Sequence, residues 1–355
     1  MSGIMNKKLL IIGSNTIHTY NYISLIQDYF DDILLLTNKT NDKYNINTIE
    51  IDFSLGVKIF FSANKIKNIA KEFKPSIIHI HQANSYAFIS LLGLKNIKIP
   101  KVLTAWGSDI LINPRKNIIF KKMLEFVLKY VDIVTSDSLY MANEIKTYNP
   151  NADIKVANFG IELKEIDWSK KENIIYSNRL HKSLYNIEKI IYAFNKFVTK
   201  NKDWRLIIGA TGDGTEKLKK LARDLHIEEN INFIGWVDSN INNDMYQKAK
   251  IYISIPSSDA TSISLLEAIS NNCICFLSNL PANCEHILDK VNGFIEPNLD
   301  NICLEKYQDI DIKLLREVND IRKKEYSKQY NKRKFIAIYN NLVEKKGNNN
   351  EYTVS

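Results

Sequence analysis

The sequence predicts an α/β protein built from two doubly wound parallel-sheet domains. Short apolar stretches typical of buried strands alternate with stretches of helical spacing along the chain. The pattern starts at residues 9–13 and restarts at 173–178, after a charged segment over 161–172 that breaks the apolar rhythm. A chain of 355 residues is long enough to bury two such cores.

The predicted strands set the limits of the two domains. In the first half they are 9–13, 32–37, 76–81, 101–106, 132–137 and 154–160, with helical stretches such as 57–73 and 120–130 between them. In the second half they are 173–178, 205–210, 231–236, 251–255 and 274–278, with a helix over 216–225. We therefore expect a first domain over 1–165 and a second over 172–313, joined by a linker over 161–172.

Composition narrows the classes of function. The net charge of +8 comes from basic residues that are scattered rather than clustered, which argues against a nucleic-acid partner. A solvated surface and a patch facing an anionic membrane both remain open. The cysteines, Cys273, Cys275, Cys284 and Cys303, have no zinc-ligand spacing and read as reduced thiols of a cytoplasmic protein. Neither a signal sequence nor an apolar run long enough to span a membrane is expected.

The segment 256–297 is the most informative part of the chain. Asp259 opens a loop of small and hydroxylated residues, and seven residues separate it from Glu267 in an apolar helix start. The free N–H groups at the start of a helix, over 261–264, suit a diphosphate. An acidic side chain placed beside them suits the hydroxyl groups of a sugar. The alternative is an ordinary amphipathic helix that follows a strand.

This segment resembles the donor-sugar motif of glycosyltransferase family 4, which usually reads Glu-x7-Glu. Asp259 stands where the family has the first Glu, and Pro281, Asn283, Glu285 and the Asn292-Gly293 turn also fit. The resemblance implies the GT-B architecture, with two Rossmann-like domains facing a cleft. It also implies a retaining transferase that uses a nucleotide-sugar, most often a UDP-sugar, without a metal or other cofactor.

Further matches in the second half carry the implied donor site. Arg179, in Asn178-Arg179-Leu180, stands where the family's Gly-Arg-Leu arginine grips the diphosphate, and Lys182 is the candidate for its accompanying lysine. The resemblance implies that Asp259 binds sugar hydroxyls and Glu267 the ribose. The other donor-binding candidates are Gly13, Gly212, Gly235, Trp236, Thr261, Ser262, Ile263 and Ser264. For the turn over 209–214, which contains Gly212, an ordinary tight turn is an equal alternative.

The first half supplies the implied acceptor side. His18 follows a predicted strand, and His81 and Trp106 end two others. These three residues are candidates for lining the cleft, and Asp109 is a candidate catalytic residue. Many family members carry a histidine where Trp106 stands, so Asp109 or the Gly107-Ser108 backbone would compensate, or Trp106 would stack on a sugar ring. We expect His79 and His81 to point to opposite faces of their strand and so not to share a metal ion. Structural roles for His18 and His81 remain open.

The C-terminal residues 314–346 are expected to form a helix. Phe335, Ile338, Tyr339 and Leu342 have the spacing of one helix face. In proteins of the GT-B architecture a terminal helix crosses back onto the first domain, and an independent surface helix is the alternative. Residues 347–355 are expected to be disordered.

The sequence therefore predicts an enzyme that moves a sugar from a nucleotide-sugar to a glycan or lipid-linked acceptor. The resemblance suggests bacterial surface polysaccharide synthesis, such as O-antigen, capsule or lipopolysaccharide, at the cytoplasmic membrane face. Two alternatives stay open: a nucleotide-sugar epimerase of the same fold, and a non-catalytic nucleotide-sugar-binding protein. Asp309 and Asp311 have the letters of a metal-binding Asp-x-Asp but lie far from any strand end, so no metal site is assigned.

Overall fold

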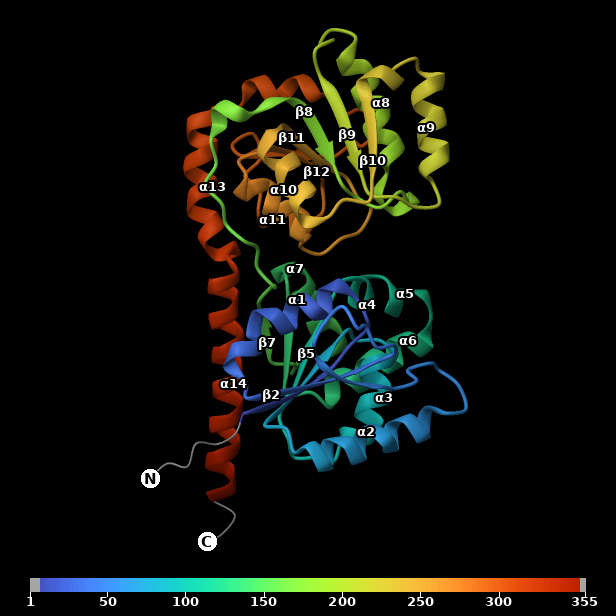
Figure 1. The fold of residues 1–355 in the computed structure, drawn as a ribbon, viewed down its shortest axis with the longest axis vertical. Helices are drawn as coiled ribbons and strands as arrows, with labels where there is room; N and C mark the ends of the chain where they lie inside the picture. The colour runs from blue at the N-terminus through green and yellow to red at the C-terminus, as the bar shows by residue number, and fades with distance from the viewer. Residues whose placement is uncertain (1–6, 352–355) are drawn as a thin grey trace. The chain divides into compact units, whose positions relative to one another are not determined.

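The computed structural model describes the backbone of residues 7–351 and the side chains of residues 7–345. The chain divides into two compact units, one of Met1–Gly160 with Lys328–Ser355 and one of Ile161–Ser327. Each is an α/β unit with its own sheet (Figure 1).

The first unit is built on a seven-stranded sheet in the order β3-β2-β1-β4-β5-β6-β7. Each strand pairing in it is parallel. The strands are β1 (Lys8–Ile12), β2 (Asp32–Thr37), β3 (Asn47–Glu50), β4 (Ile77–His81), β5 (Lys101–Thr104), β6 (Ile133–Ser136) and β7 (Ile154–Val156). The helices are α1 (Ile17–Ile26), α2 (Ile59–Phe73), α3 (Ser85–Leu94), α4 (Ser108–Leu111), α5 (Asn113–Lys116), α6 (Ile118–Lys129), α7 (Leu139–Tyr148) and α14 (Lys328–Glu351), with one turn of 3-10 helix, η1 (Gln27–Tyr29).

The second unit has a six-stranded parallel sheet in the order β10-β9-β8-β11-β12-β13. Its strands are β8 (Glu172–Ser177), β9 (Arg205–Gly209), β10 (Ile231–Gly235), β11 (Ala249–Ser254), β12 (Ile274–Ser278) and β13 (Gly293–Glu296). Its helices are α8 (Ile187–Val198), α9 (Thr215–Asp224), α10 (Ser239–Lys248), α11 (Ile263–Ser270), α12 (Pro281–Cys284) and α13 (Ile312–Tyr326). Short 3-10 turns are η2 (Trp168–Lys170), η3 (Ser183–Tyr185), η4 (Glu228–Asn230) and η5 (Leu304–Asp309).

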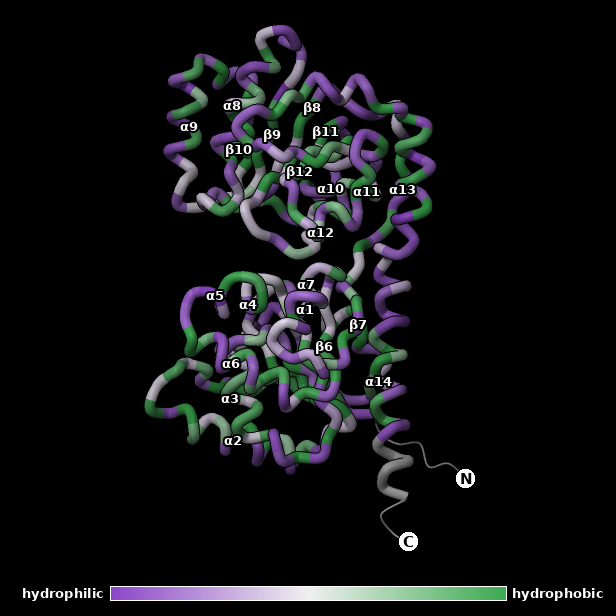
Figure 2. Tube along the Cα trace, turned by 180° about the vertical axis from the view of Figure 1, so that it is seen from behind, coloured by the Kyte–Doolittle hydropathy of each residue, from purple (hydrophilic) through white to green (hydrophobic). Residues whose placement is uncertain are grey.

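The central strands are buried and mainly apolar because helices cover both faces of each sheet. All five residues of β4 and of β12 are buried, and Figure 2 shows the strands of both units as mainly hydrophobic segments. Helices bury one stripe only: in α8 the buried side chains include Ile187, Ile190, Ile191 and Phe194, the spacing of one helix face.

The observed C-terminal part differs from the expected one. The sequence predicted one helix over 314–346 belonging to the first domain, but the chain forms two helices that part at Ser327. α13 belongs to the second unit, and only α14 packs in the first, where Phe335, Ile338, Tyr339 and Leu342 join the core. The backbone of α14 continues to Glu351, past residue 347 where a disordered tail was expected. Residues 352–355 lie outside the described residues.

The expected linker also belongs to a unit. Ile161 forms a parallel bridge with Ser327, so the segment after Gly160 is tied to the end of α13. The unit boundary therefore lies at Gly160 rather than within 161–172.

Candidate active site

Each sheet has one point where the strand order reverses, and candidate residues gather at both. In the second sheet β8 and β11 are neighbours, and Arg179 follows β8 while Asp259 follows β11. In the first sheet β1 and β4 are neighbours, and Gly13 and His81 stand at their carboxyl ends. Open α/β sheets bind ligands at such reversal points, outside the carboxyl ends of the strands.

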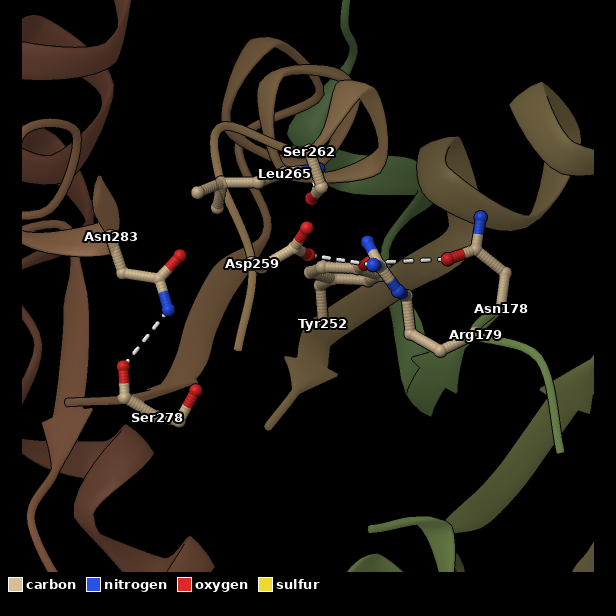
Figure 3. A network of polar contacts seen from close by, with 8 residues as sticks. All are labelled: Asn178, Arg179, Tyr252, Asp259, Ser262, Leu265, Ser278 and Asn283. Atoms are coloured by element: carbon tan, nitrogen blue, oxygen red, sulfur yellow. Dashed lines mark hydrogen bonds and ion pairs between the residues drawn. The ribbon is translucent and has the colours of Figure 1, made fainter. Parts of the chain in front are cut away.

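An ion pair between Arg179 and Asp259 forms the centre of the second unit's edge. The Arg179 Nη2 atom lies 2.6 Å from Asp259 Oδ2 (Figure 3). The guanidinium also lies 4.6 Å from the centre of the Tyr185 ring. The Arg179 side chain is 11% exposed and that of Asp259 is 26% exposed. The pair is thus mostly buried but keeps a face open to a ligand.

Burial and pairing act against each other on the pKa values of this pair. Burial lowers the pKa of the Arg179 guanidinium, but the Asp259 carboxylate and the Tyr252 and Tyr185 phenols outweigh it and raise that pKa. Burial raises the pKa of Asp259, and the Arg179 charge only partly offsets this. A guanidinium that stays charged in a partly dry site suits phosphate oxygens.

The start of α11 lies beside this pair. Ser262 caps the helix by accepting a hydrogen bond from the Leu265 N–H at 3.2 Å. Because the first N–H groups of a helix have no acceptor within it, those of Ile263 and Ser264 point out of its positive end. Thr261 is buried, and its hydroxyl is 3.0 Å from His286 Nε2, which fixes the approach to the helix.

A network of amide and phenol groups links the carboxyl end of β8, beside Arg179, to Glu267. Asn242 of α10 donates to Glu267 Oε2 at 3.1 Å and accepts from the Tyr176 hydroxyl at 2.7 Å. Asn178, next to Arg179, donates to Asn242 at 2.8 Å and accepts from the Tyr252 hydroxyl at 3.1 Å (Figure 3). The Glu267 carboxylate is therefore held in place from a second helix.

Two glycine turns complete the edge. A side chain at Gly212 would come within 2.7 Å of the His181 carbonyl oxygen, so only glycine allows this close approach. Gly235 has a φ of 72° with open space around it, and the following Trp236 is 71% exposed. Lys182 is exposed at the start of η3. These backbone turns line the edge without filling it.

The first unit's edge is aromatic. His81 is fully buried, and its ring centre lies 4.6 Å from that of Tyr22 and 5.9 Å from that of Trp106. Neither ring nitrogen of His81 has a hydrogen-bond partner among the described residues, and the same holds for the buried Trp106 Nε1. Burial lowers the pKa of His81 to about 3, so the ring is neutral at pH 7.

His79 and His81 lie on the same face of β4, contrary to the sequence-based prediction. Their ring centres are 4.8 Å apart and both contact Tyr22. Side chains two residues apart on a strand share a face, so the expectation of opposite faces was wrong. Their surroundings differ, because His79 has partners on both nitrogens: the Tyr22 and Tyr339 hydroxyls at Nδ1 and the Thr104 hydroxyl, at 2.7 Å, at Nε2.

Asp109 joins two loops of this edge. It is 4% exposed, and its Oδ2 atom accepts from the Ala83 N–H at 2.7 Å while Oδ1 accepts from the Trp106 N–H at 3.0 Å. Burial raises its pKa, and these N–H donors limit the rise. The carboxylate of Asp109 thus positions Trp106.

His18 on α1 is exposed, and its ring meets the Trp106 ring edge-on with 5.4 Å between the ring centres.

Family models match both units. The model described as "Glycosyl transferase 4-like" matches residues 7–138, and that described as "Glycosyl transferases group 1" matches residues 161–306. The chain belongs to the GT-B glycosyltransferases of the family 4 type.

Similar glycosyltransferases agree with this. The N-acetyl-alpha-D-glucosaminyl L-malate synthase of Bacillus anthracis is 27% identical over 233 residues, which cover 60% of this chain and 59% of that protein. The alpha-monoglucosyldiacylglycerol synthase of Streptococcus pneumoniae is 23% identical over 257 residues, covering 65% and 58%. The chain thus spans less than two thirds of the length of either relative.

A solved structure supports the fold. Anabaena HepE, crystallised in complex with UDP and glucose, superposes with a TM-score of 0.78 at 12% identity, covering 95% of this chain and 100% of that chain. The GT-B architecture predicted from the sequence is confirmed.

The glycosyltransferase's predicted site residues fall into two groups. Arg179, Asp259, Thr261, Ser262 and the other residues of the α11 start meet at the second unit's reversal point, with Glu267 one turn further along the helix. Gly13, His81, Trp106 and His18 meet in the first unit: a side chain at Gly13 would lie 3.3 Å from the His81 Cβ atom. Gly13, which was predicted to bind donor, therefore lies with the predicted acceptor residues.

Sequence reasoning missed the residues that hold the site. Asn178 and Tyr252 contact each other beside Arg179, and Asn242 and Tyr176 hold Glu267. Asn178 could have been found, since it stands directly before Arg179 at a strand end. Tyr176 and Tyr252 read as ordinary apolar strand residues, and nothing in the sequence links Asn242 to Glu267.

Two features are absent from the described residues. No helix there is long and apolar enough to cross a membrane. No group of three or more His, Cys, Asp or Glu side chains among them could hold a metal ion.

Proposed function

We propose that this glycosyltransferase moves a sugar from a UDP-sugar to a glycan or lipid-linked acceptor with retention of configuration. The observation that supports this most is the Arg179–Asp259 ion pair, at the reversal point of the second sheet and beside the start of α11. A cation and a helix N-terminus suit a diphosphate, and a carboxylate beside them suits sugar hydroxyls.

In this proposal the donor binds the second unit. Arg179, with Lys182 and the N–H groups over 261–264, holds the diphosphate. Asp259 accepts hydrogen bonds from hydroxyls of the donor sugar, and its partner Arg179 keeps it oriented. Glu267, held by Asn242, binds the ribose. The Gly212 turn and the backbone after Gly235 approach the rest of the nucleotide.

The acceptor binds the first unit in this proposal. Buried polar atoms without partners are costly, so the ring nitrogens of His81 and Nε1 of Trp106 mark a place where a polar ligand can be accommodated. His18 and the Trp106 ring add one exposed polar side chain and one aromatic surface. Asp109 acts as a positioning residue, because both of its oxygens are taken up by the Ala83 and Trp106 backbone.

The proposed reaction is a displacement on one face of the donor sugar. The acceptor hydroxyl attacks the anomeric carbon as its bond to the diphosphate oxygen breaks. The acceptor proton passes to the departing phosphate oxygen. Arg179 and the positive end of α11 stabilise the charge that develops on the diphosphate, and we propose that no metal ion takes part.

The name of one similar enzyme suggests the acceptor class. One relative is named as an alpha-monoglucosyldiacylglycerol synthase and therefore makes a glycolipid. The charge of +8 suits an anionic membrane surface, where lipid-linked acceptors lie. We therefore place the reaction at the cytoplasmic face of the membrane, in synthesis of a surface polysaccharide such as O-antigen, capsule or lipopolysaccharide.

The test is a thermal-shift screen of nucleotide-sugars, followed by a product assay. A donor that binds only the folded protein raises its melting temperature. The stabilising donor is then incubated with glycan and lipid-linked acceptors, and the anomeric configuration of the product is read by NMR. An inverted product overturns retention. Conversion of the donor with no acceptor present identifies an epimerase instead.

A further inference from the structure

We propose that the first unit docks on an anionic lipid surface through one apolar patch, formed by the start of α2 and the start of α6. This inference rests on the proposed membrane-side function and names the surface that would carry it. The patch consists of Leu55, Val57, Phe60, Phe61, Ile118 and Ile119, all of them exposed.

The exposure of these side chains is unusual. Val57 is 100% exposed, Phe60 78% and Phe61 73%, and Ile118 and Ile119 are 63% and 65% exposed. Exposed large apolar residues scattered singly need no explanation, but a contiguous group of them marks an interaction surface. Val57 belongs to the loop before α2, and this loop projects from its unit (Figure 1).

The two segments are neighbours in space. Leu55, from the loop before α2, lines a pocket of about 140 Å³ together with Asn113 of α5 and with Phe120 and Met123 of α6. The exposed residues therefore lie on both sides of one shared pocket: Val57, Phe60 and Phe61 continue from Leu55, and Ile118 and Ile119 precede Phe120.

The apolar side chains of α2 cannot turn inward. The buried face of this helix is Ser62, Ala63, Ile66 and Ala70. A side chain on Gly93 of α3 would come within 2.1 Å of the Ala63 carbonyl oxygen, so the two helices pack backbone to backbone there. This close contact fixes the rotation of α2 and keeps Phe60 and Phe61 outside.

The charges around the patch favour a negatively charged partner. Lys58, Arg115, Lys116, Lys121 and Lys122 are exposed around the apolar residues. Acids also lie near them: Asp52 interacts with Lys58, Arg115 pairs with Glu144 and Lys122 with Glu125, and Asp109 is buried at the shared pocket. Basic residues that flank exposed aromatic and aliphatic side chains are typical of a surface that binds an anionic membrane interface.

A second copy of the chain fits the patch less well. A two-fold contact brings the same patch together from both copies, and with it the same lysines. Lys116 and Lys121 would then face like charges across the contact, whereas anionic lipid headgroups would neutralise them.

The test is co-sedimentation of the purified full chain with vesicles of phosphatidylcholine, with and without phosphatidylglycerol. The wild type is expected to bind the anionic vesicles, and V57S/F60S/F61S and I118S/I119S are each expected to lower the bound fraction at least tenfold. K116E/K121E is expected to weaken binding to anionic vesicles alone. The matched control is I321S, an equally exposed apolar residue of α13 (71%), which leaves vesicle binding unchanged.

The readouts separate this inference from the proposed function. UDP binding, measured by calorimetry, is expected to be the same in all of these variants, since none lies in the donor site. A wild type that ignores anionic vesicles, or equal loss in I321S, overturns the docking surface whatever UDP does. A wild-type dimer that V57S/F60S/F61S converts to monomer, without lipid binding, assigns the patch to a second copy and also overturns the proposal. Failure to bind any nucleotide-sugar overturns only the proposed function.

Discussion

The two reversal points of this glycosyltransferase are built in opposite ways. In the second unit Arg179, Asp259 and Glu267 are held by partners: Arg179 and Asp259 pair with each other, and Glu267 is held by Asn242. In the first unit the ring nitrogens of His81 and the Nε1 atom of Trp106 are buried without hydrogen-bond partners among the described residues. The same topology thus carries one preorganised polar site and one aromatic site.

The difference indicates where binding specificity resides. A diphosphate is common to all nucleotide-sugars, so its site can be fixed in advance by ion pairs and hydrogen bonds, which lowers the cost of ordering it. The carboxyl edge of the first sheet carries aromatic rings, which offer a shaped surface with few polar atoms. Such a surface suits the acceptor, which is the more variable substrate. We expect substitutions at Arg179, Glu267, Asp109 and His81 to separate the two edges, and they are ordered from the largest effect to the smallest.

Arg179→Ala is expected to have the largest effect. Removing one preorganised donor to a developing negative charge lowers rates by a factor of about 10² to 10³. Initial rates of transfer from the donor found in the screen measure this, with circular dichroism to check the fold. Arg179→Lys keeps the charge without the fork and is expected to lose less. Transfer at the wild-type rate in Arg179→Ala contradicts the donor site.

Glu267→Gln is expected to weaken UDP binding about tenfold or more, because hydrogen bonds to a charged group contribute about 1.5–3 kcal/mol. Asn242→Ala is expected to weaken UDP binding less, because the Asn242 side chain only positions the Glu267 carboxylate. Calorimetry with UDP and with 2′,3′-dideoxy-UDP reports on the ribose. If Glu267→Gln weakens both ligands equally, Glu267 does not contact the ribose hydroxyls.

Asp109→Ala tests the first unit. It leaves the buried N–H groups of Ala83 and Trp106 without their acceptor, which costs about 1–3 kcal/mol of unfolding free energy. Urea unfolding measures this loss, and UDP affinity is expected to stay at the wild-type value. Asp109→Asn retains one acceptor and is expected to lose less stability. Weaker UDP binding in Asp109→Ala would place this carboxylate in the donor site.

His81→Phe is expected to have the smallest effect of these substitutions on the free energy of unfolding at pH 7. It should also remove part of the pH dependence of that free energy. The folded pKa of His81, about 3, lies below the ordinary value of 6.5. The unfolded chain therefore binds more protons between these values, and stability is lost as the pH falls from about 6.5 toward 3. Each pH unit corresponds to about 1.4 kcal/mol for such a group.

Urea unfolding at pH 7 and at pH 5 checks this. The drop in unfolding free energy between the two is expected to be smaller in His81→Phe than in the wild type. An equal drop shows that the pKa of His81 is the same in the folded and the unfolded protein, which contradicts its burial without partners.

Much of this molecule could be predicted from the sequence. Strand and helix alternation gave the two sheets, since parallel strands covered on both faces read as apolar runs. The ion pair partners Arg179 and Asp259 were both named from motifs, although they stand far apart in the chain. The positions of strand-end residues are predictable because the carboxyl ends of parallel strands all lie at one edge of the sheet. No knowledge of a specific long-range contact is needed to place them there.

The sequence-based prediction missed the features that depend on packing between distant segments. The break at Ser327 between α13 and α14 has no Pro or Gly signal, and the two helices separate because each packs in a different core. The role of Asp109 in holding two loops follows from its burial, which its sequence neighbours do not reveal. Asn242 reaches Glu267 from another helix, a contact that no local pattern encodes.

The central claim is that the second unit binds the donor's diphosphate through Arg179 and the start of α11 without a metal ion. Titration of UDP into the full chain in the presence of EDTA tests it most directly. We expect UDP to bind the wild type in chelator and to bind Arg179→Ala about a hundredfold more weakly. Binding that appears only when Mn²⁺ is restored, or equal affinity in the two proteins, would contradict it.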